Sequence, residues 1–183
     1  MSTATTINQL TGTWNLDPSH TRIGFVARHA MVTKVRGNFN DFSGTAVIGD
    51  DLGSSSVEVK IVANSVDTRS AQRDEHLRSG DFFGSDEHPE IIFRSTTVQE
   101  TGPNSFEITG DLSIKDVTKS LTIPFTYEGS ATDPFGNERA GFEGSVVVNR
   151  KDYGINWNAA LDAGGVLVSE KVTLEFEVSA IKA

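Results

Sequence analysis

Apolar and polar residues alternate along most of this chain. Residues 106–114, FEITGDLSI, place an apolar or small residue at every second position, with polar residues between them. A period of two is typical of a strand in an antiparallel sheet that has one face toward a core and the other toward water. The pattern predicts about eight strands, over 21–29, 34–48, 57–63, 91–98, 106–114, 121–127, 139–148 and 172–178.

Glycines interrupt several of these strands, at Gly24, Gly37, Gly44, Gly110 and Gly144. A glycine within a strand often marks a bulge or a sharp bend, which a strongly curved sheet needs. About eight curved antiparallel strands favour a closed barrel, which also removes exposed sheet edges; a two-sheet sandwich is the alternative. The proline at position 124 predicts an edge, a bulge or the barrel rim at that point.

One segment between the third and fourth strands lacks the β pattern. Residues 70–77 are predicted to form a short helix that Asp67, Thr68 or Ser70 caps and that Gly80 ends. The stretch RDEHLRSGDFF, residues 73–83, gathers charged groups like those of an active site. Its spacings favour a structural interpretation, in which Asp74 and Glu75 pair with Arg78 on one helical face. We expect this segment to close one end of the barrel.

Composition limits the classes of function. The 183 residues suit one domain over 1–183, with 1–10 expected to be a flexible N-terminus. The net charge of -9 disfavours nucleic acid as a partner, and the absence of cysteine excludes disulfides and thiol chemistry. Neither a secretory signal nor a long apolar stretch is evident, so no transmembrane segment and a cytoplasmic location are predicted.

Chemical motifs are missing from the sequence. There is no nucleophile elbow, phosphate-binding loop, dinucleotide fingerprint or HExxH zinc motif, so no catalytic residue, metal or cofactor is predicted. Aromatic and aliphatic residues instead recur on the inward-facing parity of the strands, where they would either fill a barrel or surround one ligand. His29 shares this parity, and it or Arg94 is expected near the polar head of a ligand. The expected ligand-binding residues are Phe25, His29, Phe39, Ile61, Phe93, Arg94, Ile108, Phe125, Phe142 and Phe176.

Six stretches together resemble the YceI family of polyisoprenoid-binding, lipocalin-like proteins. They are DPSHTRIGFVARH (17–29), VRGNFNDFSG (35–44), SVDTRSAQRDEHLRSGDFF (65–83), HPEIIFRST (88–96), GDLSIKDVTKSL (110–121) and VNRKDYG (148–154). Asp116 stands where the family commonly has glycine, and Thr21 where it has serine. The residues on signature positions are Asp17, His20, Arg73, Asp74, His76, Leu77, Asp81, Phe82, Phe83, Arg150 and Asp152.

The resemblance implies an extended eight-stranded antiparallel β-barrel with a helix near one end. It also implies non-catalytic binding, transport or storage of a polyprenyl phosphate, an isoprenoid quinone or another long apolar lipid in the pore. Burying a dozen carbons would contribute about 10 kcal/mol before the costs of association. Two alternatives stay open: an enzyme that uses His29 or His76 as acid or base, and a solid-cored stress or interaction protein. The sequence leaves room for a homodimer.

Overall fold

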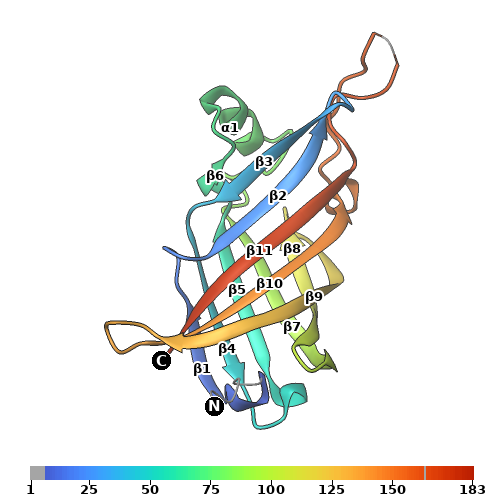
Figure 1. Cartoon of the computed structure of the whole chain (residues 1–183). Helices are drawn as coiled ribbons and strands as arrows, with labels where there is room; N and C mark the ends of the chain where they lie inside the picture. Colours follow the sequence, from blue (N-terminus) through green and yellow to red (C-terminus); the bar gives the residue numbers. More distant parts are fainter. Residues whose placement is uncertain (1–6, 163) are drawn as a thin grey trace.

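The described strands form one antiparallel sheet that closes on itself. The computed structural model describes residues 7–162 and 164–183 (Figure 1). The strands are β1 (Gly12–Leu16), β2 (Arg22–His29), β3 (Thr33–Phe39), β4 (Phe42–Ile48), β5 (Ser56–Val62), β6 (Val66–Asp67), β7 (Glu90–Gly102), β8 (Ser105–Ile114), β9 (Val117–Thr132), β10 (Glu138–Asn149) and β11 (Lys171–Lys182). The helices are α1 (Ala71–Arg78) and the 3-10 turns η1 (Ile7–Gln9), η2 (Leu52–Ser54), η3 (Ala63–Ser65) and η4 (Arg150–Tyr153).

The ring has eight members. Its order is β1-β4-β5-β7-β8-β9-β10-β11, and pairing between β1 and β11 closes it. The remaining strands, β2-β3-β6, extend the same sheet beyond the ring. Strand β11 belongs to both parts, because it pairs with β2 along one half of its length and with β1 along the other half. The predicted eight-stranded antiparallel barrel with a short helix is therefore confirmed.

The ladder between β9 and β10 stops part-way. It runs from Glu138 opposite Thr132 to Gly144 opposite Phe125, and Pro124 is the next residue of β9 beyond the last pair. Beyond that point the two strands diverge in Figure 1, and no further pairing between them occurs in the described part of the chain. Proline has no N–H to donate to a ladder, which explains why it stands at this edge, as the sequence predicted.

The strand glycines have a role that the sequence did not reveal. Gly37 lies directly opposite Phe25, and Gly144 directly opposite Phe125. A side chain at Gly144 would place its Cβ atom 2.6 Å from the Phe125 ring. The register shifts do not coincide with these two glycines: one begins at Ser95, opposite Gly110 as the sequence predicted, and another lies between Gly141 and Phe142. These two glycines thus make room for inward-facing rings, while the bulges lie at other positions.

The chain covers both ends of the barrel. At the end near the N-terminus, Ile7 and Leu10 are buried, and the Leu10 carbonyl accepts a 2.8 Å hydrogen bond from Trp14 Nε1. The expected flexible N-terminus is therefore wrong for residues 7–10, because their apolar side chains gain more by burial than they lose in chain freedom; residues 1–6 lie outside the described residues.

The segment around α1 lies at the other end. The helix begins after Ser70, whose hydroxyl accepts a 3.3 Å hydrogen bond from Arg73 N, and it ends at Arg78 with Ser79 as its C-cap, one residue before the expected Gly80. None of the helices in the described ranges is long and apolar enough to cross a membrane.

Candidate ligand-binding cavity

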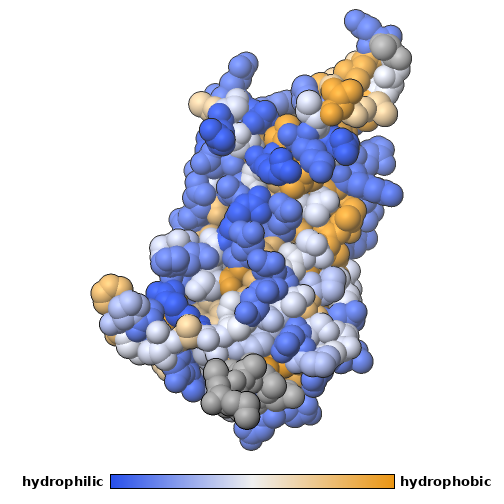
Figure 2. All heavy atoms as spheres, in the orientation of Figure 1, coloured by the Kyte–Doolittle hydropathy of each residue, from blue (hydrophilic) through white to orange (hydrophobic). Residues whose placement is uncertain are grey.

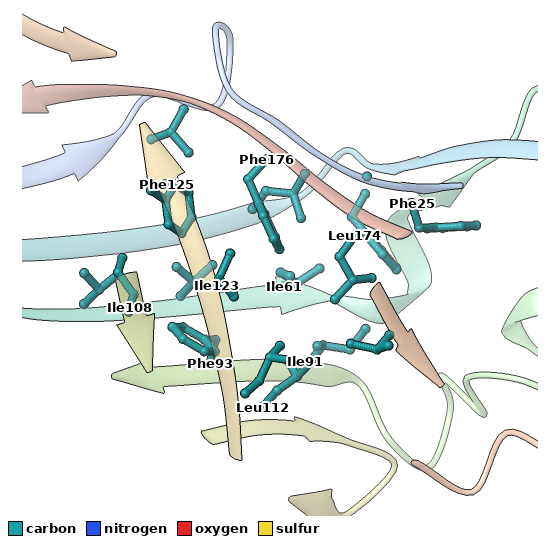
Figure 3. A pocket seen from close by; sticks show the side chains of 18 of the residues that line it. Phe25, Ile61, Ile91, Phe93, Ile108, Leu112, Ile123, Phe125, Leu174 and Phe176 are labelled. Carbon is teal, nitrogen blue, oxygen red and sulfur yellow. The ribbon is translucent and has the colours of Figure 1, made fainter. Parts of the chain in front are cut away.

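An apolar cavity runs along the inside of the barrel. Its lining extends from Ile7, Trp14 and Leu52 at one end to Phe83 and Val168 at the other. Its volume is about 260 Å³, close to the lower limit of the about 300–1,000 Å³ that is usual for ligand sites. Figure 3 shows aliphatic and aromatic side chains from opposite walls pointing toward one another across this space.

Most of the predicted ligand-binding residues line the cavity. Their rings pack in pairs, with Phe106 stacked on Phe125 at 5.6 Å and Phe125 tilted against Phe176 at 5.9 Å. Inward parity alone was a sufficient signal for these positions. The predicted residues found in the lining are Phe25, Phe39, Ile61, Phe93, Ile108, Phe125, Phe142 and Phe176.

His29 and Arg94 lie outside the cavity lining as far as the structure describes it, so their predicted positions need correction. Arg94 projects from the outer face, where its side chain is 61% exposed and its Nε lies 3.4 Å from Glu58 Oε2. His29 ends β2 beyond the cavity, where it is exposed and forms a bridge with Val168. Alternation assigned His29 to the inward-facing side of its strand, but this part of β2 extends beyond the end of the barrel. Its position counts against an enzyme that uses His29 inside the pore.

The closing segment is held by Thr68 rather than by ion pairs within the helix. Buried Asp74 accepts hydrogen bonds from Thr68 N at 2.8 Å and from Thr68 Oγ1 at 2.5 Å. Arg73 donates to the hydroxyl and the carbonyl of the same threonine. Arg78 donates to the carbonyls of Asn64 and Val66. The expected pairs of Asp74 and Glu75 with Arg78 are therefore absent from the described contacts, because backbone groups around the corner compete for the same side chains.

Aromatic residues anchor this segment to the barrel. Phe83 packs on Phe39, with ring centroids 5.5 Å apart, and lines the cavity together with Phe82 and Leu77. His76 lies outside the lining: its Nε2 is 2.9 Å from Asp81 Oδ2, and its ring packs edge-on against Trp157 at 4.7 Å. This arrangement agrees with an end closure and gives His76 a structural role.

The other signature residues also hold corners of the fold. Asp17 Oδ2 accepts a 2.6 Å hydrogen bond from Arg139 and lies 2.7 Å from His20 Nδ1. Arg139 also donates to Asp133 in the β9–β10 hairpin. The bond from Arg139 keeps the pKa of Asp17 far below its ordinary value, although burial opposes the shift. Asp152 is exposed within η4.

Arg150 has a feature that the sequence did not predict. It is buried, and it is the sole charged residue in the described lining of the cavity. Its guanidinium donates to the carbonyls of Ser169, Ile155 and Val168, at 2.8, 2.8 and 3.3 Å. Burial lowers its pKa, yet an arginine stays protonated. No pattern in the sequence around Arg150 indicated that this residue would be buried beside the cavity.

The side chains that commonly bind metal ions do not gather into one cluster in the described residues. Within residues 7–162 and 164–183, no group of three or more His, Asp or Glu converges as a metal site would require. The site is thus an apolar tube with one buried guanidinium near the end that α1 closes.

Comparison with known proteins identifies the family. The sequence model of the YceI-like domain matches residues 14–180. The chain belongs to the YceI-like family. A UPF0312 protein of Staphylococcus aureus strain N315 is 37% identical to this YceI-like chain over 170 residues, covering 91% of it and 95% of the relative.

Solved structures share the YceI-like barrel. BcnA of Burkholderia cenocepacia superposes with a TM-score of 0.79 at 20% identity, covering 90% of this chain and 98% of that one. The YCEI protein of Campylobacter jejuni gives a TM-score of 0.73 at 26% identity, covering 85% and 90%. A polyisoprenoid binding domain from Saccharophagus degradans gives 0.71 at 14% identity, covering 93% and 98%. These likenesses confirm the fold that the resemblance implied.

Proposed function

We propose that this protein binds a long isoprenoid lipid in the barrel and carries or stores it without changing it chemically. The observation that carries the proposal is the apolar cavity that runs the length of the barrel. Each methylene group buried there contributes roughly 0.8 kcal/mol. The cavity also counts against a solid-cored protein, and the polyisoprenoid-binding domain of the same fold supports the choice of ligand class.

The small volume of the cavity restricts how a long chain would fit. At about 260 Å³, the cavity holds a part of a long polyprenyl chain in its present form. The remainder of the chain would displace cavity side chains or extend beyond an end of the barrel. Phe83 and Leu77 of the closing segment would be the first side chains to move at their end, since they form part of the lining without belonging to a strand.

Arg150 is the group that we expect to meet a polar head. A guanidinium has five N–H groups, and three of those of Arg150 donate to carbonyls, which leaves two for a ligand. A phosphate would be the best match, because its oxygens accept charge-assisted hydrogen bonds. This favours a polyprenyl phosphate over an isoprenoid quinone. The test compares the affinities of a polyprenyl phosphate and of the neutral alcohol of equal length, measured by calorimetry on the unaltered protein. Equal affinities would contradict a role for Arg150.

The binding proposal is tested by a matched pair of substitutions on β4. Ala46 lines the cavity, and its neighbour Val47 is 45% exposed on the outer face. Ala46→Phe should fill the cavity and abolish binding of polyprenyl compounds, while Val47→Phe should leave binding unchanged. Lipid extraction and mass spectrometry of the purified native protein provide the direct measurement. Recovery of no lipid, together with no binding of added polyprenyl compounds, would refute the proposal.

The cytoplasmic location and the homodimer stay predictions. Cell fractionation and sedimentation velocity are the measurements that test them.

A further inference from the structure

Two hairpins project side by side beyond one end of the barrel. The first is the turn between β2 and β3, residues 30–32, and the second lies between η4 and β11 (Figure 1). Ala30 N donates a 2.8 Å hydrogen bond to Leu167 O, and the sulfur of Met31 lies against Gly165. We call residues 30–32 and 164–167 the paired tips. They extend from the cavity end, because Val168 lines the cavity and bridges to His29.

The paired tips present large apolar side chains to solvent. Met31 is 60% exposed, Val32 75% and Val166 39%. Figure 2 shows apolar surface on this projection, with strongly hydrophilic surface directly below it. Ala30 and Met31 also have φ values of 51° and 65°, a left-handed conformation that costs about 1–2 kcal/mol for such residues. Two consecutive residues in this conformation also occur in other tight hairpin turns, so it is the exposure of methionine and valine, and not the strain, that points to a partner.

The charge around the tips is opposite to that of the whole protein. Residues 18–40 contain four Arg or Lys and no Asp or Glu, although the chain has a net charge of -9. Arg28 and Lys34 face each other across β2 and β3, and like charges in that position repel. With Arg36, they are exposed and form no ion pair among the described residues. The second hairpin carries an opposing charge at Asp162, which is exposed.

We propose that the paired tips dock onto the surface of an anionic lipid membrane. Their apolar side chains would enter the interfacial layer, and Arg28, Lys34 and Arg36 would contact anionic headgroups. Apolar insertion combined with basic residues is the arrangement by which proteins bind reversibly to such surfaces. Docking would direct the Arg150 end of the cavity toward the bilayer, from which an isoprenoid lipid would enter; this last consequence rests on the proposed function, whereas docking itself does not.

Flotation with vesicles tests the proposal on the full chain. The protein should float with vesicles of phosphatidylcholine and phosphatidylglycerol, bind pure phosphatidylcholine vesicles much more weakly, and dissociate as salt is added. The double substitution Met31→Asp and Val32→Asp should weaken binding by at least about tenfold. Phe135→Asp is the matched control, because Phe135 is 88% exposed at the tip of the β9–β10 hairpin, beside Asp133 and Glu138.

Substitutions of single charged residues should change vesicle binding in opposite directions. Lys34→Gln should weaken binding to the anionic vesicles by about fivefold, and Asp162→Asn should strengthen it by a similar factor. Circular dichroism and binding of a polyprenyl compound should be unchanged in all of these variants, because none of the altered residues lies in the cavity lining. A protein that binds lipid ligand but no vesicle would therefore overturn the docking proposal and leave the proposed function standing.

Two further outcomes would also overturn the proposal. One is an equal loss of vesicle binding in Phe135→Asp, which would show a non-specific response to an added acid. The other is a dimer in sedimentation velocity that the double substitution separates while vesicle binding persists, which would assign the paired tips to a second copy of this chain.

Discussion

Asp116 stands at the tip of the β8–β9 hairpin with a φ of 64°, directly after Lys115 with a φ of 53°. Two consecutive left-handed residues define a tight hairpin turn that glycine relieves, since it lacks a Cβ atom. The resemblance of the sequence to the YceI family implies glycine at this position, so the departure has a conformational meaning. Aspartate tolerates this region better than most residues do, which explains why the turn still forms.

Asp116→Gly should raise the free energy of unfolding by up to about 1 kcal/mol, because it removes this strain. Denaturant unfolding is the measurement. The substitution also removes the contact in which Asp116 Oδ2 lies 3.2 Å from His88 Nδ1, which should matter little, since the Asp116 side chain is 88% exposed. Asp116→Ala is the control and should destabilise the protein; a gain of equal size in both variants would contradict the conformational explanation.

The carboxylate of Asp74 connects helix α1 to Thr68, the residue that holds the closing segment. Asp74→Ala should lower the free energy of unfolding by about 1–3 kcal/mol, because the N–H and hydroxyl of Thr68 would lose their buried acceptor. Glu75→Ala alters the next residue on α1, which is exposed, and should change stability by less than about 0.5 kcal/mol. If the two substitutions had equal effects on thermal unfolding, the closing segment would not depend on this network.

At the scale of elements, the corner between β1 and β2 is tied to the β9–β10 hairpin by Asp17, Arg139 and Asp133. Hydrogen bonds from Arg139 and neighbouring groups hold the pKa of Asp17 far below its ordinary value of 3.8. The backbone hydrogen bond from Asn137, together with the bond from Arg139, lowers the pKa of Asp133 to about 2. A carboxylate with a lowered pKa stabilises the folded state above its ordinary pKa. That stabilisation is lost as the pH falls from about 4 through the folded-state values.

Arg139→Gln should therefore move the acid-unfolding midpoint to a higher pH, measured by circular dichroism between neutral pH and about pH 2. Arg94→Gln is the matched control, because its pair with Glu58 is exposed and contributes little. Equal midpoints for Arg139→Gln and the unaltered protein would show that this corner does not govern acid stability.

At the scale of the whole molecule, the finite cavity predicts how affinity depends on ligand length. Each additional methylene should improve binding about fourfold while it is buried, after which affinity should level off when the chain reaches solvent. A series of polyprenyl phosphates of increasing length, measured by calorimetry, tests this. Affinity that stays constant across the series would indicate that the tail is bound outside the barrel.

Most strands and most inward residues followed from the sequence because each depends on local alternation, but β1 was not predicted and the predicted strand over 34–48 is divided into β3 and β4. The position of α1, with its cap at Ser70, likewise followed from residues close together in the chain. His29 shows the limit of this logic, since alternation gives the face of a strand but not the point where the barrel ends.

What the sequence by itself determined was the succession of antiparallel strands and their apolar inner face, because period-two patterning fixes which side chains point inward. Tertiary structure alone decided the rest: which carbonyls receive Arg78 and Arg150, which rings face Gly37 and Gly144, and where Met31 meets Gly165. These contacts join residues from separate elements, and their partners depend on the closure of the sheet. Local pattern carries no record of that closure.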